Sequence, residues 1–457
     1  MISSREQAPR FGPGHLLVDG NDDRLHRTAE FAFDPTVRQE TALIGLLRVC
    51  CETYNAGLQE RRDAWRQSRA RIRLFDQFNQ ITDLRGVRDD ALAWGARPLR
   101  GALRRVDEAY SAFYRRCAKG EVPGHPRFKA SRRFHTACWD EPIGWTASPK
   151  VGTLRIQRVG TIRLPKGAVR QLRRLADRGG VPVTLTVTRR RAGTGWSWRA
   201  SVGFKAVAAI KALPTAGVDS MVGADRGVAV SVALSDGTLL CMPPFLGDAR
   251  DEISDLLRRR DSKAVGTRAR TSLNHQAATA YRRAARRSDN WARETAKELV
   301  ARFGVVVLED LRLKNMTRSA RRTVANPGTN VAVKQALNRI LADAALGKVR
   351  HRICVKAEEA GRRTWVVNPA NTSRTCAVCG HCAPWNRRSR DLFRCVACGH
   401  EAHADLNAAR NIAARGEACE AAWRAEGSPS LVRPKPKLRR RGSTAERCSD
   451  PNILNAA

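Results

Sequence analysis

Four cysteines in two closely spaced pairs constrain the fold of this chain more than any other feature of its sequence. Two residues separate the cysteines within each pair, and fifteen residues separate the pairs. Such pairs can present four thiolates to one tetrahedral zinc ion at about 2.3 Å, which leaves no open coordination position. A redox pair or an iron–sulfur centre is the alternative interpretation. The spacing predicts a structural zinc site formed by Cys376, Cys379, Cys395 and Cys398.

The other cysteines do not suggest a disulfide framework. Thirteen cysteines occur in 457 residues, and five of them fall between residues 376 and 398. In a chain of this length, such clustering indicates metal binding, so we expect the remaining cysteines to be reduced. The N-terminal segment lacks the apolar run of a secretory signal, and no stretch of 18 apolar residues occurs. These features predict a cytoplasmic protein.

The chain carries a large excess of positive charge. Its 83 Lys and Arg residues against 44 Asp and Glu residues give a formal net charge of +39. A globule with this surplus repels itself, so a polyanion partner is the natural physical interpretation. The alternative is a ribosome-like or merely solubilising charge. The length suggests about three domains, and 42% apolar residues suffice for real cores, which argues against a disordered or fibrous protein.

The sequence of the N-terminal half predicts a β-rich domain with a helical insertion. Residues 1–26 have no apolar period and are expected to form an extended arm. A short strand is predicted at 28–33, helices from about 36 to 117, and several strands between 124 and 204. The early strand is expected to join the later ones in a small β-barrel or sandwich. We therefore place one domain at 27–205, with its helical insertion at about 36–120.

Basic and aromatic residues alternate at the start of this β-rich segment. Cations beside flat aromatic faces suit single strands or nucleic-acid backbones. A solvated basic strand with a buried Phe fits the same pattern equally well. The candidate nucleic-acid-binding residues are Arg127, Lys129, Arg132 and Arg133.

The C-terminal half predicts a mixed α/β domain, because strands alternate with helices. After a linker at about 206–217, strands are expected at 221–234, 238–242, 305–308 and 365–367, and helices at 251–303, 333–360 and 405–414. We place the α/β domain at 206–372, a metal-binding ribbon at 373–401 and the last helix at 402–415. The basic segment 416–457 is expected to be a disordered tail.

Three carboxylates of this half are candidates for a second metal site. Asp225 lies in an apolar strand, and Glu309 ends another; a buried carboxylate is costly unless it is paired, hydrogen-bonded or bound to metal. Asp405 opens a helix, where a simple N-cap is the alternative. Whether Glu309 or Asp310 faces inward cannot be read from periodicity. In an RNase H-like sheet, Asp225, Glu309 and Asp405 could hold two Mg²⁺ or Mn²⁺ ions.

The order of these motifs resembles a known family. VGADRGV, VVLEDLRLKNM, NPANTSRTCAVCGH with FRCVACGH, and HADLNAARNI, together with GHPRFK, are similar to the TnpB (OrfB) family of insertion-sequence proteins, relatives of type V CRISPR effectors. The resemblance spans about residues 28–415. It implies a wedge barrel with an inserted helical recognition part, a RuvC nuclease and a zinc-containing ribbon that binds the target strand. It also implies an RNA-guided DNA endonuclease encoded beside transposases.

The resemblance also implies a role for each of the candidate site residues. Asp225, Glu309 and Asp405 become the RuvC carboxylates, which bind Mg²⁺ or Mn²⁺, and the cysteine quartet becomes the zinc site. Guide RNA from the flanking locus and target DNA become the partners. The chain departs from the family pattern at His403 and Ala404, where the family often has an acid and a cation. This departure bears on the rate of cleavage and not on metal binding as such. A nuclease-impaired DNA- or RNA-binding regulator, or an accessory protein of transposition, is the alternative function.

Overall fold

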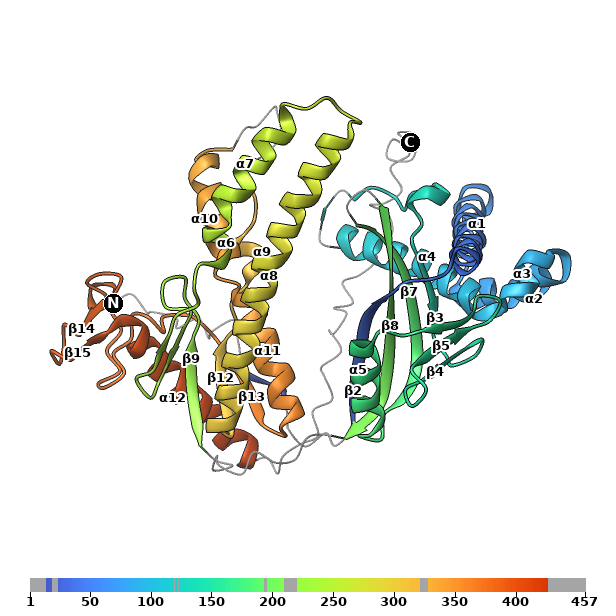
Figure 1. The fold of residues 1–457 in the computed structure, drawn as a ribbon. Helices are drawn as coiled ribbons and strands as arrows, with labels where there is room; N and C mark the ends of the chain where they lie inside the picture. Colours follow the sequence, from blue (N-terminus) through green and yellow to red (C-terminus); the bar gives the residue numbers. More distant parts are fainter. Residues whose placement is uncertain are drawn as a thin grey trace.

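A computed structural model describes residues 14–18, 24–118, 120–121, 123–192, 195–208, 220–320 and 328–425 of the chain. Figure 1 shows two lobes, one formed by residues 24–208 and the other by residues 220–425 together with residues 14–18. A salt bridge of 2.8 Å between Arg27 and Glu358 joins the lobes. Within the described residues, no helix is both long enough and apolar enough to span a bilayer.

The first lobe contains two antiparallel sheets around a shared core. The larger sheet has the order β2 (Arg24–Phe33), β8 (Gly195–Ala208), β7 (Val181–Ala192) and β3 (Thr136–Trp139); the smaller has β4 (Trp145–Ser148), β5 (Thr153–Ile156) and β6 (Gly160–Arg163). Pairing of β2 with β8 confirms that the early strand joins the later β-rich segment. The described strands form two sheets and not one closed barrel, because no ladder connects the two.

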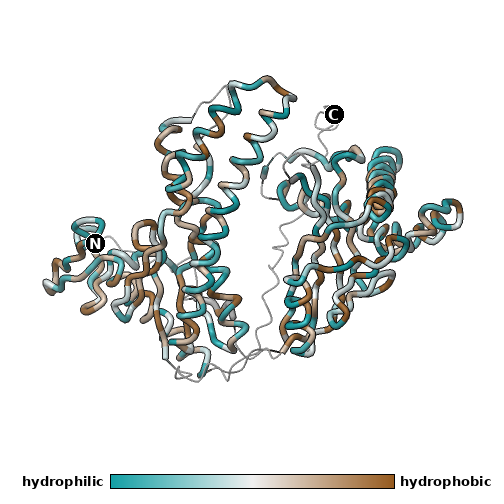
Figure 2. The backbone as a smooth tube through the Cα atoms, in the orientation of Figure 1, coloured by the Kyte–Doolittle hydropathy of each residue, from teal (hydrophilic) through white to brown (hydrophobic). Residues whose placement is uncertain are grey.

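Helices fill the chain between β2 and β3, as the sequence predicts. They are α1 (Val37–Ser68), α2 (Leu74–Val87), α3 (Asp89–Trp94) and α4 (Ala96–Cys117), while α5 (Lys166–Ala176) lies between β6 and β7. A capping box between Thr36 and Gln39 satisfies the first N–H groups of α1. Figure 2 shows apolar and hydrophilic residues alternating along α1, the mark of an amphipathic helix.

The second lobe is built on a six-stranded mixed sheet. Its order is β1 (Gly14–Val18), β13 (Arg363–Val367), β12 (Val305–Glu309), β9 (Met221–Asp225), β10 (Val232–Leu234) and β11 (Leu239–Leu240). β12 runs parallel to both β9 and β13, whereas β10 is antiparallel to β9 and to β11. The carboxyl ends of β9 and β12 therefore meet at one edge of the sheet.

Helices cover both faces of this sheet. The helices that lie against it are α8 (Arg268–Arg302), α11 (Leu346–Glu359) and α12 (Ala404–Ala425); the other helices of this lobe are α6 (Phe245–Asp248), α7 (Arg250–Asp261), α9 (Leu313–Met316) and α10 (Val331–Asp343). Val306 and Leu308 pack on the side of α8 and α11, while Val305 and Val307 pack on the side of α12. This period of two, with every residue buried, explains the continuous apolar run of β12.

Helix α12 lies directly against β9 and β12, and two glycines make this contact possible. A Cβ at Gly223 would lie 2.2 Å from the carbonyl oxygen of Ala409, and a Cβ at Gly416 would lie 2.3 Å from a methyl group of Val307. Any side chain at either glycine would push the helix off the sheet. This close packing holds the start of α12 near the ends of the two strands.

Three long elements expected from the sequence are interrupted in the structure. The strand at 221–234 is two antiparallel strands, because the chain reverses after Arg226, where Gly227 approaches the carbonyl of Val230. The helix at 251–303 is a hairpin of α7 and α8, broken near Gly266 with a φ of +90°. The helix at 333–360 breaks at Ala345, which has a φ of +50°. Apolar periodicity does not reveal such breaks when no proline marks them.

The expected ends of the chain also differ from the structure. Residues 14–18, assigned to an extended arm, form edge strand β1 paired with β13, a contact too distant in sequence for local patterning to reveal. Helix α12 continues past residue 415 to Ala425, because Cys419, Glu420 and Trp423 are buried against the sheet. The rest of the predicted disordered tail, 426–457, lies outside the described residues.

Candidate metal centres

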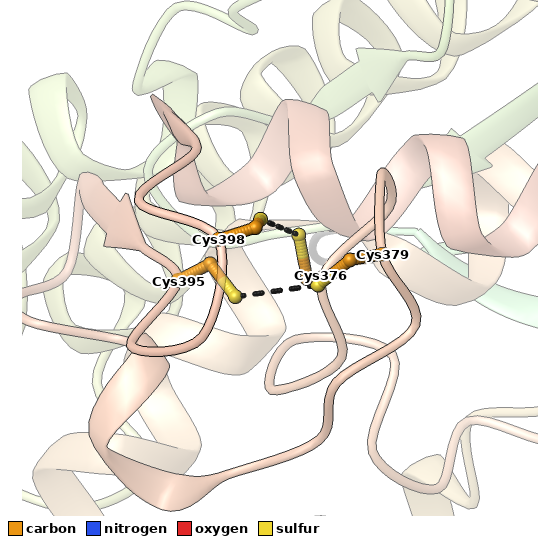
Figure 3. A group of neighbouring side chains, drawn as sticks. All are labelled: Cys376, Cys379, Cys395 and Cys398. Carbon is orange, nitrogen blue, oxygen red and sulfur yellow. Dashed lines mark hydrogen bonds between the residues drawn. The ribbon is translucent and has the colours of Figure 1, made fainter.

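The four cysteines predicted from their spacing converge on one point. Each offers a sulfur atom within 4.8 Å of the other three. The sulfurs of Cys376 and Cys398 lie 3.7 Å apart, and those of Cys379 and Cys395 lie 3.5 Å apart (Figure 3). Four thiolates around zinc at about 2.3 Å would be about 3.8 Å apart in an ideal tetrahedron. The donor set and its spacing therefore fit a tetrahedral zinc ion.

The two cysteine pairs adopt the same backbone turn. The N–H of Cys376 donates to the carbonyl of His381, and the N–H of Cys395 donates to the carbonyl of His400, both at 2.9 Å. Each turn contains a glycine with a φ near +70°, Gly380 at +75° and Gly399 at +72°. This left-handed conformation suits glycine, and it turns backbone N–H groups towards the sulfurs. Those N–H groups, chiefly that of Cys398, lower the pKa of the Cys395 thiol to about 6.

A buried asparagine joins the two turns. The amide nitrogen of Asn386 donates to the carbonyls of Arg374 and His381, and its amide oxygen accepts from the N–H of Val396, all at 2.9 Å. Asn386 is completely buried and lies in the short helix η2 (Pro384–Asn386). The rest of the ribbon is one hairpin of β14 (Leu392–Arg394) and β15 (Glu401–His403). Asn386 was not identified from the sequence, because an isolated asparagine in a polar loop gives no signal.

The three predicted carboxylates come from three elements of the second lobe. Asp225 ends β9, Glu309 ends β12, and Asp405 lies in the first turn of α12. Glu309 is only 6% exposed. Asp310 is half-buried and pairs with Arg350 at 3.2 Å, which settles which of the two neighbouring acids faces inward. Among the described residues, only the thiols gather as tightly as 4.8 Å, so the carboxylates are spread more widely.

The carboxylates influence one another electrostatically. Burial, and after it the negative charges of Glu309 and Asp405, raise the pKa of Asp225 to about 7. Burial also raises the pKa of Glu309. Like charges brought together in a desolvated place favour protonation, or a cation that neutralises them. Carboxylate oxygens are the ligands that Mg²⁺ and Mn²⁺ prefer, so this donor set fits a divalent cation.

Arginines support the carboxylates from two sides. The buried guanidinium of Arg226 donates to the backbone carbonyls of Glu309, at 2.5 Å, and Leu346, at 3.1 Å. It therefore ties the end of β12 to the start of α11. From the ribbon, Arg387 contacts the carboxylate of Asp405 at 3.4 Å. The sequence did not identify either arginine as a partner of the carboxylate site, because arginines are abundant in this chain.

The helix that carries Asp405 is capped by its neighbour. The backbone N–H of Asp405 donates to Nδ1 of His403 at 3.2 Å. The histidine side chain therefore takes the capping position that the sequence offered as an alternative role for Asp405. This bond gives His403 a local structural role.

The basic residues predicted to bind nucleic acid lie in the loop before β3 and in the short helix η1 (Ser131–Arg133). Arg127, Arg132 and Arg133 are exposed. Lys129 is half-buried, with its ammonium 4.8 Å from the ring centre of Tyr54, and Asn55 bonds both its N–H and its carbonyl. The structure thus places three of the four where a ligand could reach them and packs the fourth against the helical insertion.

We expect divalent cation binding at the carboxylates to strengthen as pH rises. Because the pKa of Asp225 is about 7, a proton competes with the cation below that pH. The apparent Mn²⁺ affinity should rise about tenfold between pH 6 and pH 8. The rise of the thermal unfolding midpoint with Mn²⁺ concentration, followed at both pH values, measures this change.

The metal-free chain should show the opposite trend. The pKa of Asp225 is raised above its ordinary value of 3.8, so the folded chain binds this proton more tightly than the unfolded chain. Its contribution to the free energy of unfolding is therefore lost as pH rises from about 4 to about 7. Asp225→Asn should remove the part of both pH effects that Asp225 contributes. Equal Mn²⁺ affinity at the two pH values would contradict the shared carboxylate site.

Comparison with known proteins identifies relatives across most of the chain. Residues 347–412 match the family described as "Cas12f1-like, TNB domain". The "Putative RNA-guided DNA endonuclease InsQ" of Escherichia coli K12 is 29% identical over 342 residues, which cover 75% of this chain and 79% of the relative. A "Putative RNA-guided DNA endonuclease" of Streptomyces pristinaespiralis is 26% identical over 408 residues, covering 87% of this chain and 91% of the relative.

A solved structure shares the fold. Cas12f1 in its complex with single guide RNA and target DNA superposes with a TM-score of 0.53 over 82% of each chain, at 15% sequence identity. The family match at 347–412 contains the whole cysteine quartet, Asp405 and part of α11.

Proposed function

We propose that this chain, which belongs to the TnpB family of insertion-sequence proteins related to type V CRISPR effectors, is an RNA-guided DNA endonuclease. The observation that supports the proposal is the environment of Asp225, where burial, and after it the negative charges of Glu309 and Asp405, raise the pKa of its carboxyl to about 7. Its relatives named as RNA-guided DNA endonucleases align over most of the chain, and they extend the same conclusion to guide and target.

The sheet of the second lobe supports a RuvC-type nuclease. Its strand order is β1-β13-β12-β9-β10-β11, in which β9, β10 and β11 are successively antiparallel and β12 and β13 run parallel to β9. We infer that this is an RNase H-like sheet spanning the proposed domain 206–372, to which α12 returns after the ribbon. The first lobe then corresponds to the wedge domain, with α1 to α4 as its recognition insertion.

Asp225, Glu309 and Asp405 would hold the catalytic cations. Two divalent ions bound there would activate a water and stabilise the leaving oxygen of a DNA phosphodiester. The buried strand ends fix Asp225 and Glu309, and α12 brings Asp405 to them across the glycine contact at Gly223. Arg387 stands at the edge of this site, where a guanidinium suits a phosphate of the incoming strand.

The cysteine quartet would hold structural zinc. All four ligand positions are cysteines, so the ion would stabilise the ribbon and leave catalysis to the carboxylates. We infer that the ribbon, at about residues 373–401, contacts target nucleic acid. Its position beside Asp405 would direct a strand towards the nuclease site.

Basic residues at the junction of the two lobes suit the nucleic-acid backbone. A hollow of about 400 Å³ is lined from α5, α8 and α11 by five basic and two acidic residues, together with Gln171 and Val355. The charged ones are Arg174, Arg293, Lys297, Arg352, Lys356, Glu294 and Glu359. The five basic residues of this hollow, together with exposed Arg127, Arg132 and Arg133, would bind guide RNA and its duplex with target DNA largely through phosphates.

The first test is the RNA that accompanies the protein. The protein is expressed with its native flanking DNA and purified at moderate salt. We expect it to retain one discrete RNA that is transcribed from that flank. Sequencing the bound RNA measures this. A control chain expressed without the flanking DNA should retain no such species. A mixture of unrelated host RNA in both preparations would contradict guide dependence. The net charge of +39 would then indicate only a surface that binds polyanions in general.

A further inference from the structure

We propose that Thr372 is a positioning residue that fixes the carboxylate of Glu309 for cation binding and connects it to the zinc ribbon. This inference rests on the proposed nuclease function. Thr372 lies in the loop after β13, four residues before the first cysteine of the ribbon. It is not one of the proposed metal ligands, and its role would be to act through Glu309.

The contact between the two side chains is short and buried. The hydroxyl of Thr372 donates to Oε1 of Glu309 at 2.6 Å. Thr372 is 4% exposed and Glu309 is 6% exposed. A hydroxyl has one hydrogen, and a charged acceptor makes the stronger bond, so the carboxylate takes it in preference to the carbonyl of Pro369, which lies 3.1 Å away. Fixing Oε1 in this way also fixes the direction in which Oε2 points.

Thr372 is itself held by the helix that carries Asp405. The side-chain amide of Asn411 on α12 donates to the carbonyls of Thr372, at 2.8 Å, and Thr375, at 2.7 Å. Asn411 is largely buried, so water competes little for these bonds. The threonine that orients Glu309 is therefore fixed relative to the helix that presents Asp405.

The same helix is also hydrogen-bonded to the first cysteine turn of the ribbon. One turn before Asn411, the side chain of Asn407 accepts from the N–H of Ala377 and donates to the carbonyl of Thr375. Asn407 is completely buried. The segment from Thr372 to Ala377 is thus bonded along its length to α12, with Glu309 at one end and the cysteine quartet at the other. A folded ribbon would hold the Thr372 hydroxyl against Glu309.

Partners of this kind have measurable effects on metal sites. Groups that hydrogen-bond a metal ligand orient it, and their loss typically costs about 10- to 100-fold in metal affinity or activity. Without the hydroxyl, Glu309 would be free to adopt other rotamers and would keep a buried oxygen without its donor. A threonine at this position thus has a role that packing alone would not require, since valine has the same shape.

Three variants test this role. Thr372→Val removes the hydroxyl at nearly constant shape, and Thr372→Ser retains it. Thr375→Val is the matched control, because it removes a hydroxyl of the same segment that donates only to the carbonyl of Asn371.

Two readouts are needed. Electron paramagnetic resonance follows Mn²⁺ binding to the zinc-loaded full chain, with Asp225→Ala as the baseline for other sites. Cleavage by the guide complex gives the half-saturating Mn²⁺ concentration.

We expect Thr372→Val to raise both the dissociation constant and the half-saturating Mn²⁺ concentration about tenfold or more, and Thr372→Ser and Thr375→Val to stay within about twofold of wild type. Guide binding and zinc content should be unchanged in all three. If Thr372→Val bound Mn²⁺ like wild type, the positioning role would be refuted while the nuclease proposal stood. If wild type showed no Mn²⁺ binding above the Asp225→Ala baseline, the carboxylate site and this inference would both fail.

Discussion

Replacing Asp225 with alanine is expected to abolish DNA cleavage while guide and target binding persist. Asp225 ends β9 at the centre of the carboxylate group and is proposed to bind the cations directly, whereas the phosphate contacts lie on other residues. Loss of a group that merely supports a ligand costs up to about 100-fold, so loss of the ligand should exceed that. The initial rate of cleavage of a guide-matched plasmid in Mg²⁺ measures the effect, and gel-shift titration measures binding.

Two features make this result interpretable. Asp310→Ala removes a neighbouring acid that pairs with Arg350 outside the site, and it should cleave nearly as wild type does. The Asp225→Ala chain should also unfold no more easily than wild type without metal, because the substitution relieves repulsion among buried carboxylates. Cleavage by Asp225→Ala at the wild-type rate would refute the assignment of Asp225 as a ligand.

Replacing Cys395 with serine is expected to abolish binding of the proposed zinc ion and unfold the ribbon, with loss of cleavage as a consequence. The apolar core of the ribbon consists of only four residues, Cys376, Phe393, Cys395 and Ala404, too few to hold it folded without metal. Zinc binding supplies about 10 to 16 kcal/mol in small domains of this kind. Zinc content by mass spectrometry, proteolysis within residues 373–401 and the cleavage rate measure the three effects.

Cys382→Ser is the control for the zinc experiment. Cys382 is an exposed cysteine of the same ribbon that lies outside the quartet, so its replacement should leave zinc content and cleavage close to wild type. A Cys395→Ser chain that kept one zinc ion and resisted proteolysis would contradict the structural role of the quartet. Retained cleavage with a proteolysed ribbon would instead contradict the link from the ribbon through Thr372 to Glu309.

The sequence points to the candidate ligands of both proposed centres, but not to the residues that support them. The cysteine spacing is rigidly linked to one geometry, so it identified the thiols that converge in the structure. Asp225 and Glu309 were identifiable because a carboxylate ending an apolar strand is costly without a partner. By contrast, Thr372, Asn386 and Arg226 gave no signal. Their roles depend on which backbone carbonyls and carboxylates the fold brings to them, and that information is not local.

The same distinction holds for the fold. The alternation of strands and helices indicated a mixed α/β lobe, and the early strand was correctly joined to the β-rich segment. The pairing of β1 with β13 was missed, because some 350 residues separate the two strands in the chain. The breaks between β9 and β10 and at Ala345 were also missed. Neither break is marked by a proline, and Ala345 adopts a left-handed conformation, with a φ of +50°, without being a glycine.

Programmed cleavage by the purified complex tests the central claim most directly. Wild-type protein with its bound RNA is incubated in Mg²⁺ with two plasmids that differ only in whether the target matches the guide. The account predicts cleavage of the matched plasmid alone, and none when Mg²⁺ is withheld. Equal cleavage of both plasmids, or cleavage of neither by a zinc-loaded complex that binds the matched target, would contradict an RNA-guided nuclease.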